Sequence, residues 1–198
     1  MIFITFSGTD GSGKSTQLTL LREHFEKNGK KVAYFHAVEF SLANRLKRKV
    51  GGKNTFTPGS EKASIKTSLY LLLLRKLFLV IDIYRFRLLV KSLQKDKVDI
   101  LLSDRYFYDS VVNIEYLSGS KAFHRLDRMI TRPDFAIFLD VSPDEIMKRD
   151  RAPEQGIEYV SRKRDLFLAD MNRFGLIRID ADKTKEETFL SVMSSIEP

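Results

Sequence analysis

The chain has 198 residues, of which 43% are hydrophobic and 30% are charged, and this composition is typical of a single globular domain. It contains no cysteine, which excludes disulfide bonds and thiolate metal sites and fits a reducing compartment such as the cytoplasm. Its formal net charge of +8 favours an anionic partner, either a polyanion or several phosphate groups held in one cleft.

The first third of the chain predicts two strands separated by a helix. The apolar run 2–7 predicts a strand, and apolar residues spaced three and four apart predict a helix from Lys14 to about Gly29. Residues 31–36 predict a second strand, and residues 41–50 predict a short basic helix.

The middle of the chain contains its most apolar region, residues 68–90. Charged side chains interrupt this region throughout, so it lacks the about 20 consecutive apolar residues of a membrane helix, and we expect no membrane partner. Residues 61–95 instead predict core helix in two pieces, because the mean helix has about 11–12 residues. Residues 99–104 predict a strand that ends in a carboxylate, and residues 108–117 predict another helix.

The last third continues the alternation of strand and helix. Residues 135–141 predict a strand, and Ser142 is a suitable N-cap for the helix that follows it. Residues 157–173 predict a helix, 176–180 a last strand and 185–196 a closing helix. Apolar strands that alternate with helices indicate a parallel sheet covered on both faces, so we predict one α/β domain over the whole chain.

The loop between the first strand and the first helix matches the phosphate-binding motif G-x-x-x-x-G-K-[ST]. Its glycines permit backbone angles that direct several N–H groups at one anion, and the helix directs its positive end at the same point. Lys14 can reach the β and γ phosphates, and the Ser15 hydroxyl can ligate Mg²⁺. We therefore predict a site for a nucleoside triphosphate, formed by Gly8, Thr9, Asp10, Gly11, Ser12, Gly13, Lys14, Ser15 and Thr16.

A second polar group follows the strand at residues 99–104, where the sequence continues as Asp104-Arg105-Tyr106. Ligands of open α/β sheets bind at the carboxyl ends of the strands, which places this tripeptide beside the loop. Asp104 could join the magnesium shell, and Arg105 could bind a second phosphate through two hydrogen bonds. The alternative is an aspartate that starts a helix, followed by a solvated arginine.

With these motifs, and with RPDFAIFLDVSPDEIMKRDR at 132–151, the chain resembles the thymidylate kinase family over nearly its whole length. The resemblance implies a P-loop NTPase fold with a five-stranded parallel sheet of order 2-3-1-4-5, helices on both faces and a lid at about 148–157. It also implies transfer of the γ-phosphoryl group of ATP to dTMP, giving dTDP and ADP, with Mg²⁺ as cofactor. The family resemblance further implies a cytoplasmic homodimer formed by the central helices.

The resemblance also implies roles for particular residues. Asp10 would face the sugar and phosphate of the acceptor, and Arg105 would bind the acceptor phosphate. Arg149 and Arg151 would close over the transferred group, because Gly11 stands where some members carry a loop arginine. The predicted catalytic residues are Asp10, Lys14, Arg105, Arg149 and Arg151, and the predicted acceptor-binding residues are Asp10, Glu39, Arg85, Asp104, Arg105 and Tyr106.

Two departures from the family pattern leave the acceptor base open. The family places an arginine after the second strand, where this chain keeps only Glu39; Arg45 could substitute for it or be solvated. On the long helix, Ile81 precedes Arg85 by four residues, where the family carries a phenylalanine that stacks on the base. Arg85 fits either a pocket position or the solvated side of the helix.

Other functions therefore stay open beside the hypothesis of a thymidylate kinase. One is a P-loop kinase that acts on another nucleoside monophosphate or on a deoxynucleoside. Another is a nucleotide sensor without catalysis, or an ATPase stimulated by nucleic acid, which the basic net charge would suit. The charge alone favours neither a polyanion nor a phosphate cleft, since the chain lacks a long basic run, and with the kinase as the preferred hypothesis we expect no nucleic-acid partner.

Overall fold

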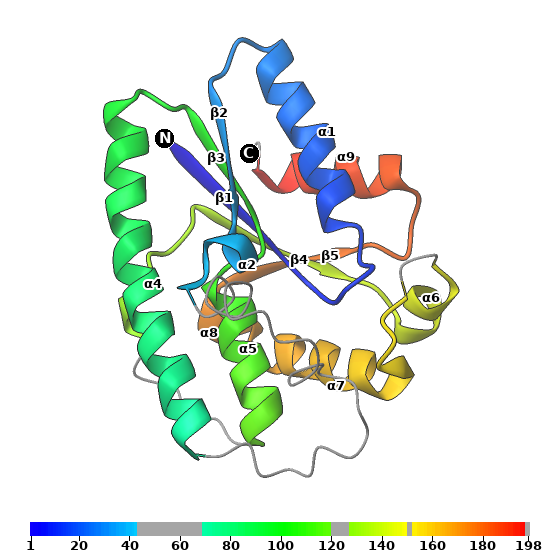
Figure 1. Ribbon diagram of the computed structural model, residues 1–198. Coiled ribbons are helices and arrows are strands. Elements are labelled where there is room, and N and C mark those ends of the chain that lie inside the picture. The colour runs from blue at the N-terminus through cyan, green and yellow to red at the C-terminus, as the bar shows by residue number, and fades with distance from the viewer. Residues whose placement is uncertain (43–68, 120–126, 150–151, 197–198) are drawn as a thin grey trace.

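The computed structural model describes residues 1–42, 69–119, 127–149 and 152–196 (Figure 1). Its centre is a five-stranded parallel sheet with the strand order β2-β3-β1-β4-β5, which confirms the predicted fold class. The strands are β1 (Ile2–Ser7), β2 (Val32–His36), β3 (Ile100–Asp104), β4 (Phe135–Asp140) and β5 (Leu176–Asp180).

Both faces of the sheet are covered, as continuous apolar strands require. Along β1 and β3, alternate side chains belong to two separate cores, because successive residues of a strand point to opposite faces. One face packs against α1 (Lys14–Lys27) and α9 (Lys185–Ile196), and the other against helices that include α4 (Leu69–Lys95) and α5 (Phe107–Ser118) (Figure 1). The remaining helices are α2 (Ala37–Phe40), α6 (Pro143–Lys148), α7 (Gly156–Ala169) and α8 (Met171–Phe174), with a 3-10 turn at Asp127–Met129.

The register of the strands brings three carboxyl ends together. Phe6 of β1 and His36 of β2 both pair with Asp104, the last residue of β3. The loop that follows β1 therefore begins next to the tip of β3, as predicted for the two polar motifs.

Two helix boundaries differ from the prediction. The helix α4 is continuous from Leu69 to Lys95, so the described part of the predicted segment 61–95 has no break, because it contains neither glycine nor proline and its buried side chains pack along α5; residues 61–68 lie outside the described ranges. The predicted helix 157–173 is interrupted at Asp170, whose buried carboxylate accepts a hydrogen bond from Arg173 (3.1 Å). The backbone of Asp170 has φ −104° and ψ +9°, outside the helical range, so α7 ends there and α8 begins after it. The predicted helix 41–50 lies outside the described residues, apart from its first two positions.

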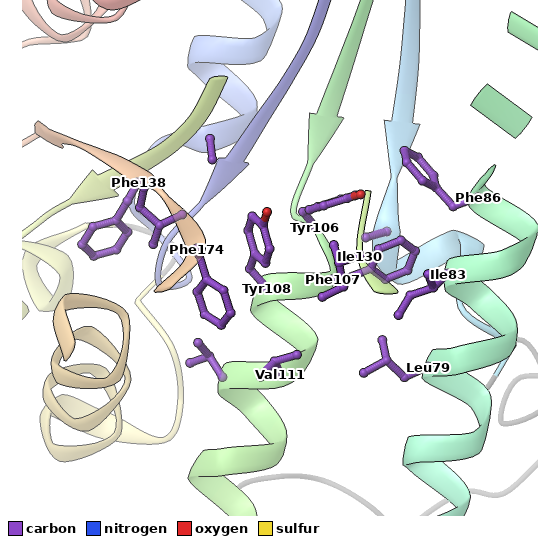
Figure 2. Close-up of a cluster of buried hydrophobic side chains, with 14 of the residues drawn as sticks. Leu79, Ile83, Phe86, Tyr106, Phe107, Tyr108, Val111, Ile130, Phe138 and Phe174 are labelled. Atoms are coloured by element: carbon purple, nitrogen blue, oxygen red, sulfur yellow. The ribbon is translucent and has the colours of Figure 1, made fainter. Parts of the chain in front are cut away.

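An aromatic core supports the tip of β3. Figure 2 shows Leu79, Ile83 and Phe86 of α4 on one side of this core, with Tyr106 and the first residues of α5 beside them. The Tyr106 ring is completely buried and lies 5.2 Å from the Phe3 ring and 5.5 Å from the Phe86 ring. This packing anchors the chain immediately after Arg105.

In the part of the chain that the structure describes, none of the helices has the length and apolar character needed to cross a bilayer.

Candidate active site

The loop between β1 and α1 has the backbone geometry that its glycines permit. Gly8 has φ +147°, and a Cβ there would lie 2.8 Å from Ser12 Oγ and 2.9 Å from the Leu139 carbonyl oxygen. Gly13, at the N-cap of α1, has φ +92° and leaves the start of the helix without a side-chain cap. No acidic residue occupies the first turn of this described helix, so its N–H groups and positive end favour an anion in the loop.

Lys14 is held inside this loop. Its ammonium donates to the carbonyls of Gly8 (3.1 Å) and Thr9 (2.7 Å) and to Ser12 Oγ (3.2 Å). Burial, followed by the charge of Arg105, lowers the pKa of Lys14 to about 8, against the opposing effect of nearby carboxylates. Phosphate oxygens that enter the loop would stabilise this ammonium in its charged form.

Ser15 meets Asp104 beneath the loop. The Ser15 hydroxyl donates to Asp104 Oδ2 (2.9 Å), and the Tyr34 hydroxyl donates to the same oxygen (3.2 Å). Burial, and then the charge of Asp104, raises the pKa of Tyr34, so this hydroxyl stays a donor. One hydroxyl and one carboxylate suit Mg²⁺, which takes its other ligands from water and substrate phosphates. The described residues contain no cluster of three or more histidine, aspartate or glutamate ligands.

Arg105 occupies a constrained position at the end of β3. Its φ is +63°, in the left-handed region that side chains other than glycine rarely adopt. The backbone is secured by the Arg105 amide, which donates to Phe6 (2.9 Å), and by Ser103 Oγ, which donates to the Arg105 carbonyl (2.5 Å). This geometry turns the guanidinium toward the phosphate loop, where it pairs with Asp10.

Asp109 supports Arg105 from below and was missed by sequence reasoning. Its buried Oδ2 accepts from Ser7 Oγ (2.6 Å) and from the Tyr106 amide (3.0 Å). Its Oδ1 lies 3.6 Å from Arg105 Nη1 and has no hydrogen-bond partner in the described structure. The available signal was an acidic residue near the start of the predicted helix; in the structure Asp109 is the third residue of α5, the position of the acidic member of a capping box.

Lys163 of α7 was also missed. Its side chain is buried where α7 packs against α5 and α6, within range of the charges of Asp10, Arg105 and Asp109, and burial together with the Arg105 charge lowers its pKa to about 8. In the sequence it stands between Arg162 and Arg164, a pattern typical of a solvated basic helix face.

Arg149 ends α6 and lies against the phosphate loop. Its guanidinium donates to the carbonyls of Gly11 (2.9 Å) and Ala181 (3.0 Å). The structure thus brings Arg149, a predicted catalytic residue, into contact with the phosphate loop. Arg151 and Arg45 lie outside the described residues.

Three predicted acceptor-binding residues have surroundings of their own, apart from the contacts of Arg105. Tyr106 lies in the core and donates its hydroxyl hydrogen to the Thr131 carbonyl (2.5 Å), so it has no exposed surface for a substrate. Arg85 donates to the Phe40 carbonyl (3.0 Å) and to Asp82 (2.6 Å), and its guanidinium covers the Phe40 ring. Glu39 is exposed on α2.

A parallel sheet of this order, with a phosphate loop after β1 and an arginine at the adjacent strand tip, defines the chain as a P-loop phosphotransferase. A family model described as thymidylate kinase matches residues 6–189, and the chain belongs to this family.

Relatives agree with this placement. The chain is 29% identical to a probable thymidylate kinase of Thermococcus gammatolerans, with 99% of this chain and 96% of the relative covered. It is 33% identical to a probable thymidylate kinase of Thermococcus onnurineus, with coverage of 75% and 70%. A crystal structure of thymidylate kinase from Ehrlichia chaffeensis, 23% identical, matches its fold with a TM-score of 0.67 over 99% of this chain and 98% of that one. The chain is therefore an ATP-dependent kinase of the nucleoside monophosphate class.

Proposed function

We propose that the chain transfers the γ-phosphoryl group of ATP to dTMP at the shared edge of β1 and β3. The observation that carries this assignment is the pairing of Arg105 with Asp10, which holds the guanidinium at the strand tip against the same loop that holds Lys14. One cation then serves the donor and one serves the acceptor, as a direct transfer between two phosphates requires.

On the donor side, residues 8–16 bind the triphosphate through backbone N–H groups and Lys14. Ser15 and Asp104 hold the shell of Mg²⁺, which neutralises phosphate charge when it is bound. This role is supported by the 2.9 Å distance between Ser15 Oγ and Asp104 Oδ2, which brings a hydroxyl from α1 and a carboxylate from β3 to one point.

On the acceptor side, Arg105 binds the monoester phosphate, and Asp10 faces the sugar and that phosphate. Arg149 adds positive charge to the transferred group from the α6 side of the loop, a role supported by its contact with Gly11. Arg151, a lid at about 148–157, and Arg45 stay predictions, because residues 43–68 and 150–151 lie outside the described ranges. The cysteine-free sequence supports a cytoplasmic location.

The test is an acceptor panel with labelled ATP and Mg²⁺. We expect kcat/KM for dTMP to exceed that for thymidine by at least about 10-fold, since a missing phosphate contact costs more than one decade. Among nucleoside monophosphates we expect kcat/KM to be highest for dTMP, in line with the family to which the chain belongs. Phosphorylation of thymidine but not of dTMP would contradict the acceptor assignment. ATP consumption that rises with DNA or RNA alone would favour the ATPase alternative.

We also propose a homodimer formed through α4. Five large apolar side chains are spaced three or four residues apart on one face of this helix and are 36–63% exposed; they are Leu73, Leu77, Ile81, Tyr84 and Leu88. The opposite face, with Leu79, Ile83 and Phe86, is buried in the protein's own core. A continuous apolar row of this kind is unusual on a monomer and suits the same row of a second copy.

Replacing Leu77, the second side chain of this row, with glutamate is expected to convert the dimer into a monomer, because each copy would bury an unpaired carboxylate in the interface. Sedimentation velocity at matched concentrations measures the change. The control is Leu190→Glu, which places the same charge on a side chain of α9 that is 67% exposed. A parent protein that sediments as a monomer, or a Leu77→Glu variant that stays dimeric, would disprove this interface.

A further inference from the structure

Lys163 lies near the middle of α7 with a nine-tenths buried side chain. Its position is enclosed because α7 packs against both α5 and α6. A buried ammonium is costly unless it has a hydrogen-bonding or ionic partner, since the low-dielectric interior replaces water poorly. The question is therefore which group compensates this charge.

Within the described ranges, the Lys163 ammonium has no hydrogen-bond acceptor and no ion-pair partner. Its nearest interaction is with the ring of Tyr159, whose centroid is 5.0 Å away. Other basic side chains of this layer are paired: Arg164 binds Asp140 through two hydrogen bonds of 2.6 and 3.0 Å. Lys14, also buried, donates to two carbonyls and a hydroxyl. Lys163 thus differs from its neighbours in having no protein acceptor.

The charges nearest to Lys163 are those of the acceptor side of the site. Arg105 opposes its positive charge, whereas Asp10 and Asp109 favour it. Both carboxylates already pair with Arg105, so they are shared between two cations. Arg105 and Lys163 repel each other until an anion lies between them, and such an anion would supply the acceptor that the ammonium lacks.

We propose that Lys163 is a second ligand of the acceptor phosphate, and that it binds the monoester of dTMP together with Arg105. This inference rests on the proposed function and deepens it. A dianionic monoester offers several oxygens, enough for a guanidinium and an ammonium from different elements. Thymidine, which lacks the phosphate, would leave both cations facing each other, so Lys163 also favours the monophosphate over the nucleoside.

The first test measures dTMP affinity by calorimetry, and KM for dTMP and for ATP, in Lys163→Met. Methionine keeps an unbranched side chain of similar length and removes a buried charge, so thermal stability should be equal or higher. We expect the affinity for dTMP to fall about 10- to 100-fold, the range of a charge-assisted contact, and KM for ATP to change little. Arg162→Met is the matched control, because it removes the same charge from the adjacent exposed residue of α7.

The outcomes separate this inference from the proposed function. A parent enzyme that phosphorylates dTMP, with unchanged dTMP affinity in Lys163→Met or an equal loss in Arg162→Met, overturns the role of Lys163 alone. A parent enzyme that neither binds nor phosphorylates dTMP overturns the proposed function as well.

A pH profile gives a readout that a structural role would not move. The Lys163 ammonium is faced by Arg105, Asp10, Asp109 and Tyr159, and its pKa of about 8 means that it loses its charge as the pH rises through that value. We therefore compare kcat/KM for dTMP in the parent with that in Lys163→Met at each pH, and expect the ratio of parent to variant to fall toward one at high pH. The titration of Lys14 affects both enzymes equally and does not change this ratio. Lys163→Arg keeps its charge and should retain its activity relative to Lys163→Met at high pH. If the ratio of parent to Lys163→Met stays constant as the pH rises through about 8, the proposal is overturned.

Discussion

Replacing Lys14 with methionine is expected to lower kcat by about 10²–10³-fold, the usual cost of removing one preorganised charge from a transition state. The ammonium is held by the loop carbonyls of Gly8 and Thr9, in the position where the β and γ phosphates enter. Loop N–H groups would still bind ATP, so KM for ATP should rise less than kcat falls. Initial rates at saturating ATP and dTMP measure the effect.

The control for this prediction is Lys27→Met, which makes the same change at the exposed C-terminal end of α1. Its kcat should lie within about twofold of the parent, since a surface charge this far along the helix is screened by solvent and salt. Thermal unfolding of both variants establishes that the fold is retained. A Lys14→Met enzyme with nearly the parent kcat would remove the phosphate loop from the mechanism.

Replacing Arg105 with methionine is expected to lower kcat/KM for dTMP by at least about 10³-fold. The change removes a bidentate phosphate contact and leaves the carboxylates of Asp10 and Asp109 facing an incoming anion. KM for ATP should change little, because the donor binds the loop on the other side. Steady-state rates with each substrate varied in turn provide the measurement.

The Arg105→Met variant also loses stability, because the buried Asp109 carboxylate loses its cation. Its bonds from Ser7 and the Tyr106 amide remain, so we expect a loss of about 1–3 kcal/mol. Combining Arg105→Met with Asp109→Asn should recover most of that stability but none of the activity. Recovery of dTMP phosphorylation in the double variant would show that Arg105 only supports Asp109 and does not bind the acceptor.

The helices show where sequence reasoning succeeded and where it failed. Ser142 was predicted as an N-cap, and its hydroxyl does accept a hydrogen bond from the Glu145 amide (3.4 Å), because capping needs only neighbouring residues. The break at Asp170 was missed, since the sequence there carries neither glycine nor proline, and the buried contact of this carboxylate with Arg173 exists only in the folded chain. Tyr106 was assigned to the acceptor site from its neighbours, yet packing against Phe3 and Phe86 decides its position.

The sequence by itself determined the phosphate loop, the five strands and, through the family resemblance, their order, because these depend on residues that are consecutive or regularly spaced. The tertiary structure alone decided that Asp109 lies beneath Arg105 and that Lys163 is buried within range of both charges. These side chains come from α5 and α7, which are distant along the chain and meet only when the helices pack together. Burial and charge pairing are properties of that packing. The sequence of a basic helix segment is the same whether the segment faces solvent or an active site, so the sequence alone does not distinguish the two.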